Sequence, residues 1–277
     1  MSIFKPVTLI TGASSGIGAA LARVFAENGH EIALVARRES KLAALADEIA
    51  AGGRKRPYVV TIDLTRTDSP ARISHELLMH GLEPAVIVNN AGFGLLGPAA
   101  ELDRADQLAM IDLNVRTLTD LSLRWVESLE RHRGGLLNVA SIAGFFPGPG
   151  MAVYYATKAY ALAFSEALHR ELAPRGVRVT VLCPGPVPTE FQARAGIDER
   201  RAKGLLACSA EQVARAGFHG FMRGRRLVVP GLATKLLSVL PRFVPRGVLL
   251  SMIHGIQQAP AKAVEPPGWP RRRSHRS

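Results

Sequence analysis

The stretch VTLITGASSGIG, residues 7–18, decides the fold, because it joins a short apolar strand directly to a turn with three glycines. Glycine tolerates positive φ and lets the backbone approach a ligand closely, and the first N–H groups of a following helix attract phosphate. Glycine-rich turns of this kind also occur for packing alone, but the position directly after the first strand favours a dinucleotide phosphate site. The residues predicted to form that site are Gly12, Ser14, Ser15, Gly16, Ile17 and Gly18.

Short runs rich in Val, Ile and Leu alternate along the whole chain with longer segments of helical period. This alternation is typical of a parallel sheet whose strands are joined by crossover helices. It predicts an α/β fold of the Rossmann type, a doubly wound seven-stranded parallel sheet with helices on both faces. The predicted strands are residues 7–11, 31–36, 58–62, 85–89, 136–140, 177–182 and 227–229.

Helices are predicted in the gaps between these strands. Two of them, over 17–28 and 39–51, are followed by glycine, which favours helix termination. Two longer helices are predicted over 103 to about 130 and over 152–173. Since parallel strands direct their carboxyl ends to one edge of the sheet, the loops after strands one, four, five and six should meet there.

The length of 277 residues, with 47% hydrophobic and 21% charged residues, is that of a folded protein with a sizeable core. We predict a dinucleotide-binding and catalytic domain over 1–231 and a C-terminal extension over 232–277. Two short amphipathic helices are expected in 232–258, followed by a basic, flexible tail. The extension can pack on its own domain or on a second subunit, and peripheral contact with a membrane is the alternative.

The net charge of +12 is concentrated near the C-terminus. Residues 223–277 hold eleven Lys and Arg against one acid, Glu265, so the rest of the chain is almost neutral. A basic terminal run is most often solvated, and no nucleic-acid recognition motif accompanies it. No nucleic-acid partner is therefore expected.

Two cysteines, Cys183 and Cys208, give neither a metal-ligand spacing nor a disulfide framework, so no metal site is predicted. The N-terminus shows no basic start, apolar stretch and small-residue cleavage site in that order. These features favour a cytoplasmic location.

Tyr154 and Lys158 lie four residues apart on a predicted helix, so both project from one face of it. A nearby ammonium would favour the phenolate of Tyr154 and lower its pKa from about 10, which would give a usable general acid/base. The same spacing also arises by chance in amphipathic helices. Ser141, at the end of the fifth predicted strand and thirteen residues before Tyr154, favours the catalytic interpretation.

The glycine turn, the motif Asn89-Asn90-Ala91-Gly92 after the fourth strand and the Tyr154-x-x-x-Lys158 pair together resemble the short-chain dehydrogenase/reductase family over roughly residues 5–231. The resemblance implies hydride transfer between a nicotinamide coenzyme and a ketone or aldehyde, with Tyr154 as the acid/base. It further implies that Ser141 steadies the carbonyl oxygen, that Lys158 also binds the nicotinamide ribose and that Asn114 holds a water in the proton relay.

The resemblance implies further coenzyme contacts beyond the glycine turn. The segment 184–189 is similar to the family's Pro-Gly-x-Val-x-Thr turn, although it could be an ordinary proline-rich loop. Asp63 matches an acid at the adenine, but it could equally cap the next helix. The implied contacts are Asp63, Asn90, Ala91, Gly92, Tyr154, Lys158, Pro184, Gly185, Val187 and Thr189.

The end of the second strand indicates the choice of coenzyme. Arg37 and Arg38 follow that strand at a position where an acid would bind the ribose 2′-hydroxyl of NADH. A guanidinium instead binds the 2′-phosphate, so NADPH/NADP+ is favoured over NADH/NAD+, with Ser14 as a further contact. The alternative is that both arginines are merely solvated and that Glu39 weakens their field.

Two rival functions remain open at this point. One is a non-catalytic dinucleotide-binding sensor, since fold does not fix function, and the other is a peripheral membrane reductase of lipid-like carbonyls. Residues 191–209, which close over the substrate in the family, mix apolar and basic side chains. They indicate a small-molecule substrate with an apolar or acyl body and an anionic portion, or simply a lid with two unlike faces. The resemblance implies a homodimer or homotetramer.

Overall fold

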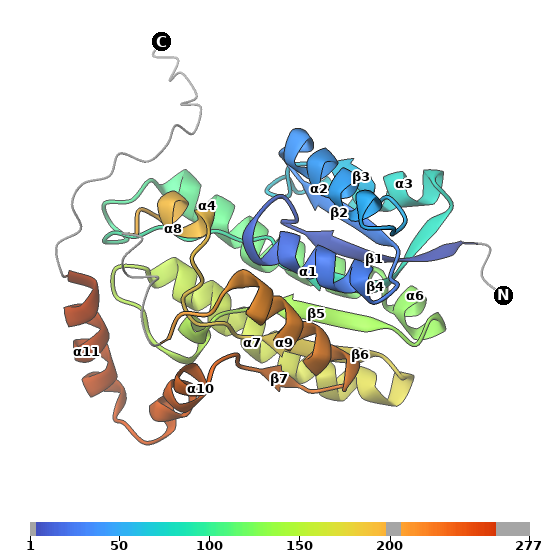
Figure 1. Ribbon diagram of the computed structural model, residues 1–277. Coiled ribbons are helices and arrows are strands. Elements are labelled where there is room, and N and C mark those ends of the chain that lie inside the picture. The colour runs from blue at the N-terminus through green and yellow to red at the C-terminus, as the bar shows by residue number, and fades with distance from the viewer. Residues whose placement is uncertain (1–3, 198–205, 259–277) are drawn as a thin grey trace, which may run out of the picture.

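Seven strands form in the computed structural model, which describes residues 4–197 and 206–258 of the chain. They are β1 (Lys5–Thr11), β2 (Ile32–Ala36), β3 (Tyr58–Thr61), β4 (Leu82–Asn89), β5 (Gly135–Val139), β6 (Arg178–Leu182) and β7 (Leu227–Val228). They pair in parallel in the order β3-β2-β1-β4-β5-β6-β7, which confirms the predicted doubly wound sheet (Figure 1). The strand order reverses between β1 and β4, the point at which such sheets bind ligands beyond their carboxyl ends.

Helices cover both faces of this sheet (Figure 1). One face is covered by α1 (Gly16–Glu27), α2 (Glu39–Ala51) and α9 (Ala210–Met222). The other is covered by α3 (Ser69–Met79) and α7 (Ala152–Leu172), among others. The helices predicted over 17–28, 39–51 and 152–173 are confirmed to within one residue at each end.

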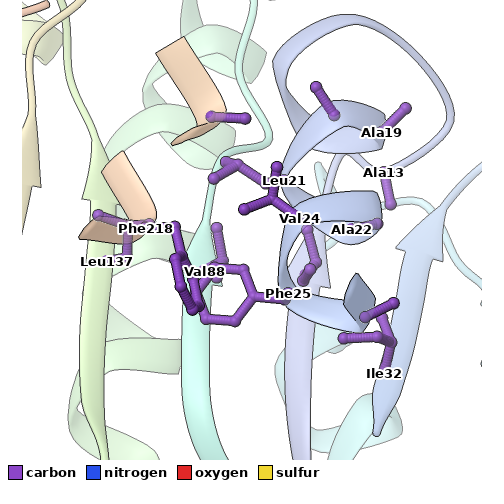
Figure 2. Close-up of a cluster of buried hydrophobic side chains, with 14 of the residues drawn as sticks. Ala13, Ala19, Leu21, Ala22, Val24, Phe25, Ile32, Val88, Leu137 and Phe218 are labelled. Atoms are coloured by element: carbon purple, nitrogen blue, oxygen red, sulfur yellow. The ribbon is translucent and has the colours of Figure 1, made fainter. Parts of the chain in front are cut away.

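Aromatic packing fixes α1 against the sheet. Phe25 of α1 meets Phe218 of α9 edge-on, with ring centroids 4.9 Å apart, in a cluster that includes Val88 and Leu137 (Figure 2). Edge-to-face pairs contribute about 0.5–1.5 kcal/mol beyond the apolar area that they bury. The packing therefore holds the glycine turn, which leads into α1, at a defined place above the end of the sheet.

The prediction of one unbroken helix over 103 to about 130 is wrong, because the structure divides this segment into several helical pieces. Asp103 caps the segment by accepting a hydrogen bond from the Asp106 amide at 3.0 Å. The segment is α4 (Arg104–Ile111), a π-helical turn η1 (Asp112–Thr117), α5 (Leu118–Arg124) and α6 (Val126–Arg131). Trp125 leaves the helical conformation at φ −116° and ψ 17°, which separates the last two. π-turns inside α-helices frequently occur at functional sites.

A buried chain of polar side chains ties α7 to the sheet. Asn89 Nδ2 at the end of β4 donates to Asn138 Oδ1 of β5 at 2.9 Å and to the Ser122 hydroxyl of α5 at 3.0 Å. Asn138 Nδ2 in turn donates to the Ser165 hydroxyl of α7 at 2.9 Å. All four side chains are buried, so these hydrogen bonds satisfy groups that have little access to water.

The predicted pair of helices in the C-terminal extension is present as α10 (Leu232–Val239) with a 3-10 turn η5 (Leu240–Arg242), followed by α11 (Arg246–Gln258). They lie on the side of the molecule that holds the carboxyl ends of the strands (Figure 1). The basic tail predicted beyond them lies outside the described residues. Among residues 4–197 and 206–258, none of the helices combines the length and the hydropathy that crossing a membrane requires.

Candidate active site

A cavity of about 910 Å³ opens at the carboxyl edge of the sheet, where the loops after β1, β2, β3, β4, β5 and β6 meet. Every site residue predicted from the sequence lines it except Gly18 and Asn114, which lie directly behind its wall. The predicted residues on the wall are Gly12, Ser14, Ser15, Gly16, Ile17, Arg37, Arg38, Asp63, Asn90, Ala91, Gly92, Ser141, Tyr154, Lys158, Pro184, Gly185, Val187 and Thr189.

The glycine turn forms one end of the cavity, a cradle whose backbone packs so closely on its neighbours that side chains at Gly12 and Gly18 would collide with them. Gly12 has φ +67°, and a Cβ there would lie 2.9 Å from Ala91 Cα. A Cβ on Gly18 would lie 2.3 Å from the Gly12 carbonyl oxygen, which no real contact allows. Gly18 therefore shapes the turn from behind, while the turn leaves room for a ligand in front.

The N-terminus of α1 is suited to hold an anion. Ser15 occupies the N-cap position in an extended conformation, yet its side chain makes no capping hydrogen bond to the first turn. Its hydroxyl instead accepts from Arg38 Nη2 at 2.9 Å. The first amides of α1 thus face the cavity without a side-chain cap, which is the donor set that a pyrophosphate requires.

The ends of β1 and β4 are joined by hydrogen bonds to one threonine. The Thr11 hydroxyl accepts from the amides of Asn90 at 3.0 Å and Ala91 at 3.1 Å, and it donates to the Val88 carbonyl at 3.2 Å. Asn90 Nδ2 donates to the Thr11 carbonyl at 2.9 Å. The motif after β4 therefore holds the glycine turn in place at the point where the strand order reverses.

Ser141 and Tyr154 meet on the opposite wall of the cavity. Ser141 caps the 3-10 turn η2 (Ile142–Phe145), and its hydroxyl accepts from the Ala143 amide at 3.1 Å. Tyr154 stands in the first turn of α7 and is only 9% exposed. Burial raises the pKa of the Tyr154 phenol well above its ordinary value, while a hydrogen bond with Ser141 acts in the opposite direction. The phenol is therefore a firmly protonated donor.

Lys158 is buried one turn along α7. Its Nζ donates to the Val139 carbonyl at 2.9 Å and lies 5.8 Å from the centroid of the Tyr154 ring. Burial lowers the pKa of the Lys158 ammonium to about 8. The prediction that the pKa of the phenol is lowered is wrong for this structure, because burial disfavours the charged phenolate and raises that pKa.

Asn114 lies in the π-turn and packs behind Gly92. Its Nδ2 donates to the Phe93 carbonyl at 3.0 Å and to the Thr157 hydroxyl at 3.1 Å, and its Oδ1 accepts from the Phe93 amide at 3.2 Å. A Cβ on Gly92 would lie 3.0 Å from Asn114 Oδ1 and 3.5 Å from Lys158 Nζ. Both Nδ2 donors are thus used within the protein, while Oδ1 can accept a second hydrogen bond.

Arg38 is engaged by an acid that the sequence reasoning did not find. Its guanidinium donates to the Ser14 hydroxyl at 2.9 Å and to Glu190 Oε2 at 2.6 Å. Glu190 begins α8 (Glu190–Ala195) and also pairs with Lys41. Hydrogen bonds from Lys41 and Arg38 hold the pKa of Glu190 down at about 2. The carboxylate that neutralises Arg38 is therefore that of Glu190 and not, as predicted, that of Glu39.

Asp63 lines the cavity, and it does not cap the next helix, α3, whose N-cap residue is Asp68. Its Oδ1 accepts from the amide of Thr65 at 3.1 Å and from the hydroxyl of Thr65 at 2.9 Å. The same carboxylate stands beside the wall formed by Arg37 and Ile62. The capping alternative is therefore wrong, because the carboxylate of Asp63 fixes the turn after β3 and not the start of α3.

Helix α8 forms the roof of the cavity. Thr189 caps it in a capping box with Gln192, and the Ala195 carbonyl accepts from the Leu96 amide at 2.9 Å. The Phe191 ring lies 5.4 Å from that of Tyr154. The Arg194 guanidinium lies 4.5 Å above the Phe93 ring, and burial lowers its pKa to about 10. Residues 198–205 of the predicted substrate loop lie outside the described residues.

Comparisons with known proteins agree with this geometry. The family described as short chain dehydrogenase matches residues 6–200. The chain belongs to this family. It is accordingly an oxidoreductase, and the short-chain dehydrogenase resemblance is confirmed.

Similar proteins include a reductase and two dehydrogenases. Sulfoacetaldehyde reductase 2 of Chromohalobacter salexigens is 36% identical over 77% of this chain and 87% of its own length. The NADP-dependent 3-hydroxy acid dehydrogenase YdfG of Salmonella typhi is 38% identical over 71% of this chain and 80% of its own. A solved short-chain dehydrogenase from Sphingobium yanoikuyae in complex with NADPH covers 93% of this chain and 99% of its own, at 32% identity and a TM-score of 0.76.

Proposed function

We propose that this short-chain dehydrogenase reduces a ketone or aldehyde with NADPH, with Tyr154 as the proton donor. The observation that carries the proposal is the convergence of Ser141, Tyr154 and Lys158 on one cavity whose other end is the glycine cradle. A non-catalytic sensor would have no need of a buried phenol and ammonium on the wall of its ligand cavity, since burying them costs free energy.

NADPH, when bound, supplies the hydride to the carbonyl carbon. The Ser141 hydroxyl holds the carbonyl oxygen, and the Tyr154 hydroxyl gives that oxygen its proton. The raised pKa of Tyr154 suits this direction, because the residue enters the reaction protonated. The Lys158 ammonium stabilises the phenolate left behind. Lys158 and a water that donates a hydrogen bond to Asn114 Oδ1 then return the proton to Tyr154.

The coenzyme would lie along the wall from the glycine cradle to Tyr154. The α1 amides would hold its pyrophosphate, Asp63 its adenine, and Asn90, Ala91 and Gly92 its ribose side. The segment from Pro184 to Thr189 would meet the nicotinamide amide. The closely packed glycine turn, which a Cβ at Gly12 or Gly18 would displace, and the uncapped N-terminus of α1 are the structural observations that fit this coenzyme.

The preference for NADPH rests on Arg38, Arg37 and Ser14. Arg38 already holds a carboxylate and two hydroxyls, which shows a donor set that a 2′-phosphate could take over. NADP-dependent 3-hydroxy acid dehydrogenase is among the similar proteins, and a similar solved enzyme carries NADPH. We expect NADPH to bind at least about 10-fold more tightly than NADH, since charge-assisted contacts to a phosphate are strong.

The substrate end of the cavity combines apolar walls with the guanidinium of Arg194. Phe191, Met151 and Leu96 stand around Tyr154, and Arg194 joins them from α8. We propose a carbonyl substrate with an apolar or acyl body and an anionic group that Arg194 attracts. Sulfoacetaldehyde reductase and 3-hydroxy acid dehydrogenase, both similar proteins, are named for anionic compounds.

The proposal is tested by incubating the full chain with a panel of carbonyls and following the absorbance of NADPH and, separately, NADH. The panel contains anionic carbonyls, such as sulfoacetaldehyde and 3-oxo acids, and neutral ketones of matched size. Turnover with NADPH on any of them supports the reductase. Binding of NADPH without turnover on any substrate would favour the sensor.

A further inference from the structure

Helix α10 buries polar side chains against the domain and exposes apolar ones to solvent. Thr234 and Ser238 point inward and are 1% and 8% exposed, whereas Leu232 and Leu236 point outward and are 76% and 68% exposed. A surface helix of a globular protein normally buries its apolar stripe against the core. The outward side of α10 is therefore an apolar surface that a binding partner is expected to bury.

The exposed apolar residues form one continuous stripe. Leu232, Leu236 and Val239 follow one another at intervals of four and three residues, which places them on one side of α10, and Phe243 comes directly after η5. Phe243 is 80% exposed. Single exposed apolar residues are common, but a row of leucines and a phenylalanine marks an interaction surface.

Positive charge borders this stripe. Lys235 lies three residues after Leu232 and Arg242 three residues after Val239, so each cation is next to the stripe on the helix surface, and both are exposed. The sequence contains no Asp or Glu between Glu211 and Glu265. This stretch thus has an apolar row flanked by cations and contains no acidic residues. It complements a partner that has an anionic surface layer over an apolar interior.

The stripe stands next to the active site. Thr234, on the inner side of α10, lies against Gly185, because a Cβ on Gly185 would be 2.9 Å from its hydroxyl. The Thr234 hydroxyl donates to the Leu206 carbonyl at 3.4 Å, within the predicted substrate loop of residues 191–209. Whatever covers α10 therefore lies beside the cavity that holds Ser141 and Tyr154.

We propose that α10 and η5 dock the enzyme on an anionic lipid bilayer, with Leu232, Leu236, Val239 and Phe243 inserted among the acyl chains and Lys235 and Arg242 at the lipid phosphates. A helix with this division of side chains lies in the plane of the membrane interface. The inference is independent of the reaction, since docking and reduction are measured separately.

A second copy of the chain fits this surface less well. A two-fold contact would place the same patch of each subunit against the other. Lys235 and Arg242 would then approach their own copies in a stretch without acidic residues to pair with. An anionic headgroup layer neutralises these cations, whereas a second copy adds to them.

The test is co-sedimentation of the full chain with vesicles of phosphatidylcholine alone and of phosphatidylcholine with phosphatidylglycerol. We expect sedimentation with the anionic vesicles, weakened by salt. The double substitution Leu236→Gln and Phe243→Gln should reduce it at least about 10-fold, because it removes two anchors. Both side chains are exposed, so the variant should keep its unfolding temperature and its affinity for NADPH.

Met79→Gln serves as the matched control, because Met79 is 71% exposed on α3, away from the extension. It should sediment like the unmodified chain. Equal sedimentation of the double variant, as binding through the basic tail alone would give, overturns the proposal. So does a change of oligomeric state in the double variant by light scattering, which would assign the stripe to a second copy.

Discussion

Tyr154 and Lys158 combine a proton donor and a cation whose pKa values burial displaces in opposite directions. The phenol becomes harder to ionise, and the ammonium becomes easier to deprotonate. Reduction requires a protonated Tyr154 and a positive Lys158 beside it. Of the two groups, Lys158 therefore limits the enzyme first as the pH rises.

The pH profile of kcat/KM for NADPH should show this limit. Because the pKa of Lys158 is about 8, the ammonium is present below that pH and is lost above it. We expect kcat/KM to be level on the acidic side and to fall about 10-fold per pH unit on the alkaline side. Lys158→Arg, which stays charged, should move the fall to higher pH even if its rate is lower. A fall that stays in place in that variant would assign it to another group.

Glu190 should compete with the coenzyme for Arg38. Glu190→Gln removes the carboxylate that Arg38 holds at 2.6 Å, so the affinity for NADPH should rise while that for NADH changes little. Both side chains are about half exposed, which limits the gain to roughly 5-fold. Isothermal titration with each coenzyme measures it. Glu39→Gln is the control, and an equal gain from that variant would contradict the competition.

Individual residues were predictable where a motif fixes them and not where the fold alone joins them. The glycine turn, Ser141, Tyr154 and Lys158 follow from spacing along the chain, and the cavity brings them together. The pairing of Arg38 with Glu190 joins residues 152 positions apart. An acid directly after Thr189 was the available signal, but only the position of α8 gives it a partner. The pKa of Tyr154 is raised where the spacing predicts a lowered one, because burial sets the direction of the shift and spacing along the chain does not reveal burial.

Among the elements, the polar chain from Asn89 through Asn138 to Ser165 positions α7, the helix that carries Tyr154 and Lys158. Asn138 accepts from one side and donates to the other. The apolar period of β5 predicts the strand correctly but does not indicate this link, because an Asn in a strand is ordinarily read as a surface residue. The π-turn at Asn114 escaped prediction for a similar reason, since its side chains keep a helical period.

Asn138→Ala should lower the free energy of unfolding by about 2 kcal/mol or more, because it leaves buried polar groups on Asn89 and Ser165 short of a partner. Urea unfolding followed by circular dichroism measures the loss. Ser74→Ala, which removes a less buried hydroxyl bond to the Pro70 carbonyl, should change stability by less than about 0.5 kcal/mol. Equal losses in the two variants would show that the buried chain has no special role.

At the scale of the whole molecule, the sheet order and the covering helices follow from the alternation of apolar runs and helical segments. The two helices of the extension were also predictable from their amphipathic pattern. The side of α10 that faces outward was not, since a hydrophobic period does not say which side the domain covers. The boundary at residue 231 and the homodimer or homotetramer stay predictions.

The central claim is that Tyr154 gives the substrate its proton, and Tyr154→Phe tests it most directly. The substitution removes one oxygen from a buried ring, so NADPH affinity by fluorescence titration should change less than about 3-fold, while turnover falls by at least about 100-fold. Tyr155→Phe is the matched control, because Tyr155 packs against Gly148, and it should keep its turnover. Loss of turnover in Tyr154→Phe with NADPH still bound is the predicted result. Turnover that survives in Tyr154→Phe would contradict the account.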